Sequence, residues 1–177
     1  MGALRNLLFL YLSNNHLSSL PESMSELSNL AYLNVTDNHL ASLPDWIGRM
    51  PSLIELRLYN NQLTFLPEAI GDLTNLREMH LMNNKLLALP NAIGKLTNLR
   101  KLDLQGNRLT SLPESFGELH NLTDLNLRYN QLTSLPSSIG QLSQLRFLDA
   151  RANGLAELPD GLQSLTQIGR ASCRERV

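Results

Sequence analysis

The sequence is poor in several features on which membrane, secreted and nucleic-acid-binding proteins depend. A single cysteine, Cys173, means that no disulfide can form within the chain, and it does not identify a compartment. No run of 18 apolar residues occurs, so we expect no membrane-spanning helix. The 15 basic and 16 acidic residues give a formal net charge of −1, without the basic excess that favours nucleic acid or anionic lipid. We therefore predict no nucleic acid partner and no membrane association.

Groups that could perform catalysis or hold a cofactor are also scarce. Catalysis requires convergent polar groups with complementary roles, and the glycines occur singly rather than in a phosphate-binding loop. His16 and His39 occupy positions 23 residues apart that could bring two metal ligands together, but no third ligand shares their register. We therefore predict no enzyme activity, no metal, no cofactor and no small-molecule substrate.

Leucine, in contrast, fills 42 of the 177 positions and recurs at a fixed interval. Aligning the chain on itself at a period of 23 residues superposes seven copies of the pattern L-x-x-L-x-L-x-x-N-x-L-x-x-L-P-x-x-I-G-x-L, without insertion or deletion. Such a period is typical of proteins built from stacked structural units. Positions in each copy are numbered here as columns 1 to 23. The copies begin at Leu7, Leu30, Leu53, Leu76, Leu99, Leu122 and Leu145.

Each copy is predicted to contain one short strand and one helical turn. In the third copy Leu56 and Leu58, in columns 4 and 6, alternate with polar residues, as in a strand with one buried face. Proline in column 15 suits the first position of a helical turn, which apolar residues in columns 18 and 21 anchor. Column 19 prefers glycine but also holds Ser25 and Gln163, which favours close packing over a left-handed backbone. Each copy can bury its leucines only against the next, so the strands must stack into a parallel sheet.

This pattern resembles the leucine-rich repeat family, specifically its class of 23-residue repeats with L-P and I-G signatures. The match covers residues 1–167, with a partial leading unit at residues 1–6 followed by the seven repeats. The resemblance implies an α/β fold, a right-handed curved solenoid. Its parallel sheet would line the concave face, and its short helical turns would lie on the convex face.

An asparagine stands in column 9 of every copy. These residues could form a polar binding stripe, or they could turn inward as a ladder that satisfies backbone groups at the bend after the strand. An amide has two donors and two acceptors, enough to serve its own loop and that of a neighbour. We favour the ladder, because buried polar groups persist only when they are paired. Its rungs would be Asn15, Asn38, Asn61, Asn84, Asn107, Asn130 and Asn153.

Columns 3, 5 and 7 alternate with the inward leucines and should face solvent on the concave side. All four tyrosines lie in these columns or in the adjacent column 8. Tyrosine and arginine often anchor protein interfaces, although strand propensity alone predicts the same placement. The mixed charges suit a protein surface better than a polyanion. We predict that a protein partner binds through Tyr11, Tyr32, Arg57, Tyr59, His80, Met82, Asp103, Arg128, Tyr129 and Arg151.

The two ends of the chain depart from the repeat. Residues 1–6 match columns 18–23, so the chain begins within a repeat and without a polar cap, and we expect the natural amino terminus upstream. The residues present contain no signal peptide. The cytoplasm is therefore favoured, and an extracellular location stays open because the natural amino terminus is missing. Residues 168–177, IGRASCRERV, resemble the in-frame translation of a widely used sequencing adapter, ATC GGA AGA GCG TCG TGT AGG GAA AGA GTG. We interpret them as a non-native tail produced by read-through, the alternative being a short basic tail.

Three functions from different classes are compatible with these observations. The first is a protein–protein interaction module that binds on its concave sheet. The second is the recognition region of a larger signalling enzyme, a kinase, GTPase or ubiquitin ligase, because proteins with similar repeats carry such domains elsewhere in the chain. The third, an extracellular receptor or adhesin, is disfavoured by the absence of cysteine-rich caps. A competing binding surface is the convex side, where Trp46 is the only tryptophan.

Overall fold

Every repeat forms one three-residue strand in columns 3 to 5, in a computed structural model that describes residues 4–172. Column 4 points into the core and columns 3 and 5 point away from it, as the alternation of leucine with polar residues predicts. The strands are β1 (Phe9–Tyr11), β2 (Tyr32–Asn34), β3 (Glu55–Arg57), β4 (Glu78–His80), β5 (Lys101–Asp103), β6 (Asp124–Asn126), β7 (Phe147–Asp149) and β8 (Arg170–Ser172).

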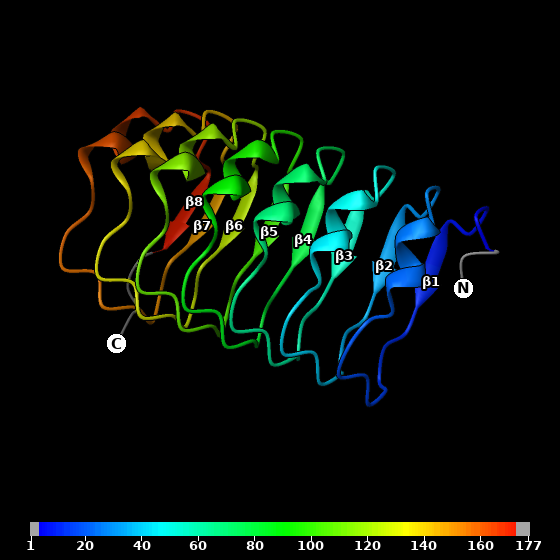
Figure 1. Ribbon diagram of the computed structural model, residues 1–177. Helices are drawn as coiled ribbons and strands as arrows, with labels where there is room; N and C mark the ends of the chain where they lie inside the picture. The colour runs from blue at the N-terminus through cyan, green and yellow to red at the C-terminus, as the bar shows by residue number, and fades with distance from the viewer. Residues whose placement is uncertain (1–3, 173–177) are drawn as a thin grey trace.

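The strands form one parallel sheet in which spatial order follows chain order from β1 to β8. The register between neighbours is 23 residues, so that Leu56 pairs with Met79 and Arg57 pairs with His80. Figure 1 shows the coils stacked as a curved row, with all strands on one side and all helical turns on the other. The predicted right-handed curved solenoid is therefore confirmed, with its sheet on the concave face.

The helical turns opposite the sheet are five-residue 3₁₀ helices. Proline in column 15 was expected to be their first residue, and this is wrong by one position. Pro67 has an extended ψ of 152° and caps the turn, while its carbonyl accepts from the Ile70 amide at 3.0 Å. The turns are η1 (Glu22–Glu26), η2 (Asp45–Arg49), η3 (Glu68–Asp72), η4 (Asn91–Lys95), η5 (Glu114–Glu118), η6 (Ser137–Gln141) and η7 (Asp160–Ser164).

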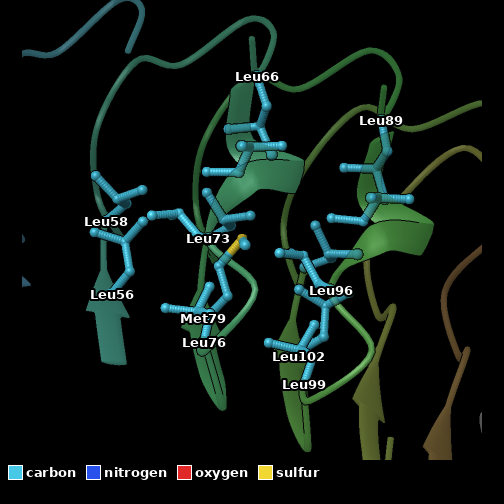
Figure 2. Close-up of a cluster of buried hydrophobic side chains, with 14 of the residues drawn as sticks. Leu56, Leu58, Leu66, Leu73, Leu76, Met79, Leu89, Leu96, Leu99 and Leu102 are labelled. Carbon is cyan, nitrogen blue, oxygen red and sulfur yellow. The ribbon is translucent and has the colours of Figure 1, made fainter. Parts of the chain in front are cut away.

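The core is one continuous cluster of apolar, mostly aliphatic side chains between the sheet and the 3₁₀ turns. Figure 2 shows Leu56 and Leu58 of the third coil beside Leu76 and Met79 of the fourth, all directed into the same interior. Leu56, Leu58, Leu76 and Met79 are completely buried. Because each coil covers the leucines of the next, burial arises only from stacking.

Glycine in column 19 allows the 3₁₀ turns of successive coils to approach closely. A Cβ atom on Gly94 would lie 2.4 Å from the backbone oxygen of Ser115 in the next coil. No left-handed backbone is required there, because the positive φ values belong to other positions. The expectation of close packing is confirmed.

Of the tail interpreted as read-through, Ile168 packs against the core and Arg170–Ser172 pair with β7, while residues 173–177 lie outside the described part of the chain. The interpretation of residues 168–177 as non-native stays a prediction. Met1, the first residue of the partial leading unit, also lies outside the described residues. Between residues 4 and 172, none of the helices has the length and apolar character that a membrane span needs.

Candidate functional site

The candidate binding face is the solvent-facing side of the concave sheet, formed by columns 3, 5 and 7 with the adjacent column 8. Tyr11 and Tyr129 are its most exposed predicted residues, with 64% and 49% of their surface accessible. The others lie half-buried among side chains of adjacent coils: Tyr32, Arg57, Tyr59, His80, Met82, Asp103, Arg128 and Arg151. Their placement on one sheet follows from the 23-residue register.

Exposure in these columns is not uniform, however. Asn34, Thr36 and Asp149 belong to them by position but are buried. Asn34 Oδ1 accepts from the Thr36 amide at 3.0 Å, and Asp149 is covered by two arginines. Neighbouring side chains therefore decide which members of a solvent-facing column are accessible.

Aromatic side chains gather at the β1–β2 end of the face. The Tyr11 and Tyr32 ring centres lie 4.9 Å apart, and those of Phe9 and Tyr32 lie 6.2 Å apart. The Arg57 guanidinium lies 5.6 Å from the centre of the Tyr32 ring. Burial raises the pKa of the Tyr32 hydroxyl, and the charge of Arg57 only partly opposes this. The end of the face is thus an apolar surface with hydroxyl groups, well suited to interface contacts.

Charged residues of alternating sign cover β3 to β5 at the centre of the face. Arg57 Nε donates to Glu55 Oε1 at 2.6 Å, and this hydrogen bond raises the pKa of Arg57. Glu78 bonds His80 Nε2 at 3.3 Å and Lys101 Nζ at 3.1 Å. Burial raises the pKa of Glu78, but the hydrogen bonds from Lys101 and His80 outweigh it and leave the pKa below its usual value. Of these five residues, we predicted only Arg57 and His80, although the others stand in the same columns.

Three of these side chains have the donor set of a metal site. Ligand atoms of Glu55, Glu78 and His80 lie within 4.8 Å of one another, half-buried on adjacent strands. Carboxylate and imidazole groups suit several divalent transition metals. Both carboxylates already bind cationic side chains, Arg57 and Lys101, which a metal ion would have to displace. The stacked pair His16 and His39, with Nδ1 and Nε2 3.4 Å apart, supplies only two ligands.

A second ionic group lies at the β6–β7 end of the face. Arg151 binds the Asp149 carboxylate through Nε at 2.9 Å and Nη2 at 2.6 Å, and Arg128 Nε lies 3.8 Å from the same carboxylate. Burial raises the pKa of Asp149, yet its bonds to Arg151 and the charge of Arg128 hold the pKa below the usual value. Arg128 also contacts the Tyr129 ring, with its guanidinium 4.9 Å from the ring centre.

Column 8, at the edge of this face, has a left-handed backbone in all seven coils. The same position of each repeat turns the chain out of the strand, and asparagine, aspartate or glycine tolerates the turn best. Asn60 and Asn83 meet this demand and link their side chains to the preceding coil, at 2.7 Å to Asp37 and 2.8 Å to Asn60. The seven residues are Asn14, Asp37, Asn60, Asn83, Gly106, Tyr129 and Ala152, and their composition was a signal that sequence reasoning missed.

The column 9 asparagines hydrogen-bond backbone groups of two adjacent coils. Asn84 Oδ1 accepts from the Leu63 amide at 3.0 Å, while its Nδ2 donates to the carbonyls of Leu58 at 3.0 Å and Leu81 at 2.9 Å. The same pattern recurs at Asn38, Asn61, Asn107, Asn130 and Asn153. Asn15 differs: it is exposed, and among the described residues its side chain bonds carbonyls of its own coil, those of Leu12 and Ser13.

Trp46 is not accessible as an anchor for the competing binding surface on the convex side. It is only 6% exposed and packs in the core at the second residue of η2. Its indole covers neighbouring apolar groups, which removes the argument for Trp46 as an accessible anchor.

A stacked, right-handed solenoid with a parallel concave sheet defines the class of this protein. A family model described as "Leucine-rich repeat region" matches residues 1–102 and 85–174. The chain belongs to the leucine-rich repeat family. A comparison with curated proteins found no significant match.

Solved structures support the same assignment. A leucine-rich repeat protein of Leptospira interrogans is 34% identical with a TM-score of 0.81, covering 99% of this chain and 51% of its own. The plant peptide hormone receptor RGFR1, solved in complex with RGF2, is 31% identical with a TM-score of 0.79, covering 93% and 28%. The ectodomain of the membrane receptor kinase GASSHO1/SCHENGEN3 from Arabidopsis thaliana, in complex with Casparian strip integrity factor 2, is 27% identical with a TM-score of 0.62, covering 96% and 27%. The chain thus spans about half or less of these proteins' lengths.

Proposed function

We propose that this chain is a protein–protein interaction module that binds its partner on the concave sheet. The observation that carries the proposal is the composition of that face: tyrosines and arginines from five of the seven coils, with mixed charge, on one continuous parallel sheet. Such residues dominate the binding energy of protein interfaces. The receptors RGFR1 and GASSHO1/SCHENGEN3, which share the fold, were solved with RGF2 and Casparian strip integrity factor 2 respectively. A protein or peptide partner is therefore the chemistry best supported.

The arrangement of charge supports a protein partner over a polyanion. Carboxylates at Glu55, Glu78 and Asp149 alternate with Arg57, Lys101 and Arg151 along the face, so that no uninterrupted basic surface exists among the described residues. Binding to nucleic acid depends on neutralising many phosphates with basic side chains. The charged groups of a protein partner can instead form new ion pairs with these residues, in place of the ion pairs within the chain.

Photo-cross-linking tests the proposal directly. A photoreactive amino acid is placed at Tyr59 or Tyr129 on the concave face, and at Asn91 or Lys95 on the opposite, convex turn η4 as matched controls. We expect a specific protein adduct from the two concave positions and none from the convex ones, in extract of the source organism. Adducts from the convex positions alone would refute the concave-face assignment.

A second proposal is that the repeats serve as the recognition region of a larger signalling enzyme. It is supported by the likeness to the ectodomain of a membrane receptor kinase, of which this chain spans 27%. The full reading frame tests it, because a kinase, GTPase or ubiquitin-ligase domain beside the repeats would establish the larger enzyme. The same reading frame distinguishes the cytoplasm, which we propose, from the extracellular location of the receptor ectodomains by the presence of a signal peptide.

A further inference from the structure

A pocket of about 200 Å³ opens on the concave face above β4 to β7. Its floor is the strand backbone at Leu102 and Leu125, whose side chains are buried in the core below. The walls are side chains of the two columns that flank column 4, which the parallel register sets side by side. Column 3 contributes Lys101, Asp124 and Phe147, and column 5 contributes His80, Asp103 and Asn126.

Two carboxylates of this pocket, Asp103 and Asp124, lie on neighbouring strands. Asp103 Oδ1 accepts from the Gln105 amide at 3.1 Å, and Asp124 Oδ2 accepts from Thr123 Oγ1 at 2.6 Å. These bonds use one oxygen of each carboxylate. Between residues 4 and 172 no ion pair forms at either of them, in contrast to the paired Glu55, Glu78 and Asp149 of the same face.

The two basic side chains that line the pocket, Lys101 and His80, are engaged elsewhere. Lys101 stands beside Asp124 in register, but its Nζ bonds Glu78 on the opposite side at 3.1 Å. His80 Nε2 also faces Glu78, at 3.3 Å. The pocket therefore carries an excess of negative charge within a face whose other ionic groups are paired. An excess of this kind attracts a cation from outside the chain.

We propose that this pocket receives an arginine side chain of the protein partner. The inference rests on the proposed function and adds to it the chemistry of one contact. A guanidinium carries five donors in a planar fork, which can reach acceptors on two neighbouring strands at once. Its flat face packs on an aromatic ring, and Phe147 supplies one beside Asp124. A lysine ammonium is a compact and strongly hydrated point charge. It has no planar fork of donors to bridge the two strands, and it packs less well on an aromatic ring than a guanidinium does.

The test is an amide chemical-shift titration of the isotopically labelled chain with three small probes. These are N-acetylarginine amide, N-acetyllysine amide and N-acetylcitrulline amide, the last being a neutral isostere of the first. We expect shifts at Lys101–Asp103, Asp124–Asn126 and Phe147 with the arginine probe. The citrulline probe should bind more weakly by about tenfold or more, as expected when charge-assisted hydrogen bonds are lost.

Two variants with equal changes in net charge separate the pocket from general electrostatics. Asp103→Asn/Asp124→Asn should abolish the arginine-induced shifts, whereas Asp45→Asn/Asp72→Asn, on the convex turns η2 and η3, should retain them. A native-like amide spectrum of each variant shows that it is folded. Equal binding of citrulline or lysine, shifts elsewhere on the molecule, or loss of binding in both variants would overturn the assignment.

The titration and the cross-linking experiment fail independently. If concave-face adducts form but the arginine probe does not bind, the pocket assignment is wrong and the interaction face stands. If the probe binds but adducts form only on the convex turns, the pocket binds arginine and the proposed function is wrong.

Discussion

The guanidinium of Arg128 lies 4.9 Å from the centre of the Tyr129 ring and donates from Nη2 to the Tyr129 hydroxyl at 3.2 Å. This pair is built on a left-handed backbone, because Tyr129 has a φ of 53°. A Cβ atom crowds the backbone in that conformation, which asparagine and glycine tolerate best. Tyr129 is therefore a strained residue with an exposed side chain on the candidate binding face. Every coil has this backbone at column 8, so the strain is a property of the repeat, and the large exposed ring is what makes Tyr129 a candidate contact.

Replacing Tyr129 should consequently separate stability from binding. We expect Tyr129→Asn to raise the free energy of unfolding by about 1 kcal/mol, since strain in the left-handed region is relieved. Capture of the cross-linked partner should weaken in the same variant. Ala152→Asn is the matched control in the next coil, where it relieves the same backbone strain and should leave capture unchanged. Denaturant unfolding and quantified capture check both values, and a less stable Tyr129→Asn would contradict the argument.

The asparagine ladder should contribute more to stability than any side chain on the exposed face. Asn84→Ala or Asn107→Ala removes a side chain that satisfies three or more backbone groups in a buried bend. We expect a loss of roughly 1–3 kcal/mol, the cost of leaving buried polar groups unpaired. Tyr59→Ala should be nearly silent in the same denaturant series. The opposite ranking would show that the ladder bonds contribute little net free energy.

The column 19 glycines should be sensitive to a single added methyl group. The Cβ of a Gly94→Ala variant would meet the Ser115 backbone oxygen at 2.4 Å, so adjacent 3₁₀ turns must move apart. We expect the variant to lose roughly 1–3 kcal/mol of stability, as for other overpacked interiors. Gly154→Ala is the control, because its Cβ would approach only the Leu132 oxygen, at 3.5 Å. Equal thermal stability of the two variants would disprove close packing as the reason for glycine.

Acid should destabilise the coils partly through Asp149. Its folded-state pKa lies below the ordinary value of 3.8, so the unfolded state binds a proton first as the pH falls. The stabilising contribution is complete above the unfolded pKa and is lost as the pH falls through the folded one. The free energy of unfolding should therefore decline below about pH 4, and less steeply in Asp149→Asn. An identical acid limb in both proteins would exclude Asp149 as a source.

The read-through interpretation of residues 168–177 makes a prediction at the level of the gene. Independent nucleotide reads across the locus should continue the repeat after Gln167 with a leucine-rich eighth copy. They should not contain the adapter codons of IGRASCRERV. Genomic coverage of those codons would instead make the segment, including Cys173, native protein.

The sequence predicted the fold and the members of the candidate face, but not the contacts between their side chains. Seven copies of one pattern determine the strand positions, the inward leucines and the shared face of Tyr59, His80 and Arg128, because an unbroken 23-residue period leaves one register. The ion-pair partners were not predictable from the sequence. Arg57 could pair with Glu55 of its own coil or with acidic residues of adjacent coils, and side-chain packing selects Glu55.

The sequence by itself determined the period, the class of fold and the exposed columns of this protein, since hydrophobic burial permits only stacking of identical units. Only the tertiary structure decided that Trp46 is buried, that Tyr129 is left-handed and that Asp103 and Asp124 share a pocket. The physical reason is that these properties depend on contacts between side chains of different coils. A one-dimensional pattern states which column a residue occupies, but not which neighbours cover it.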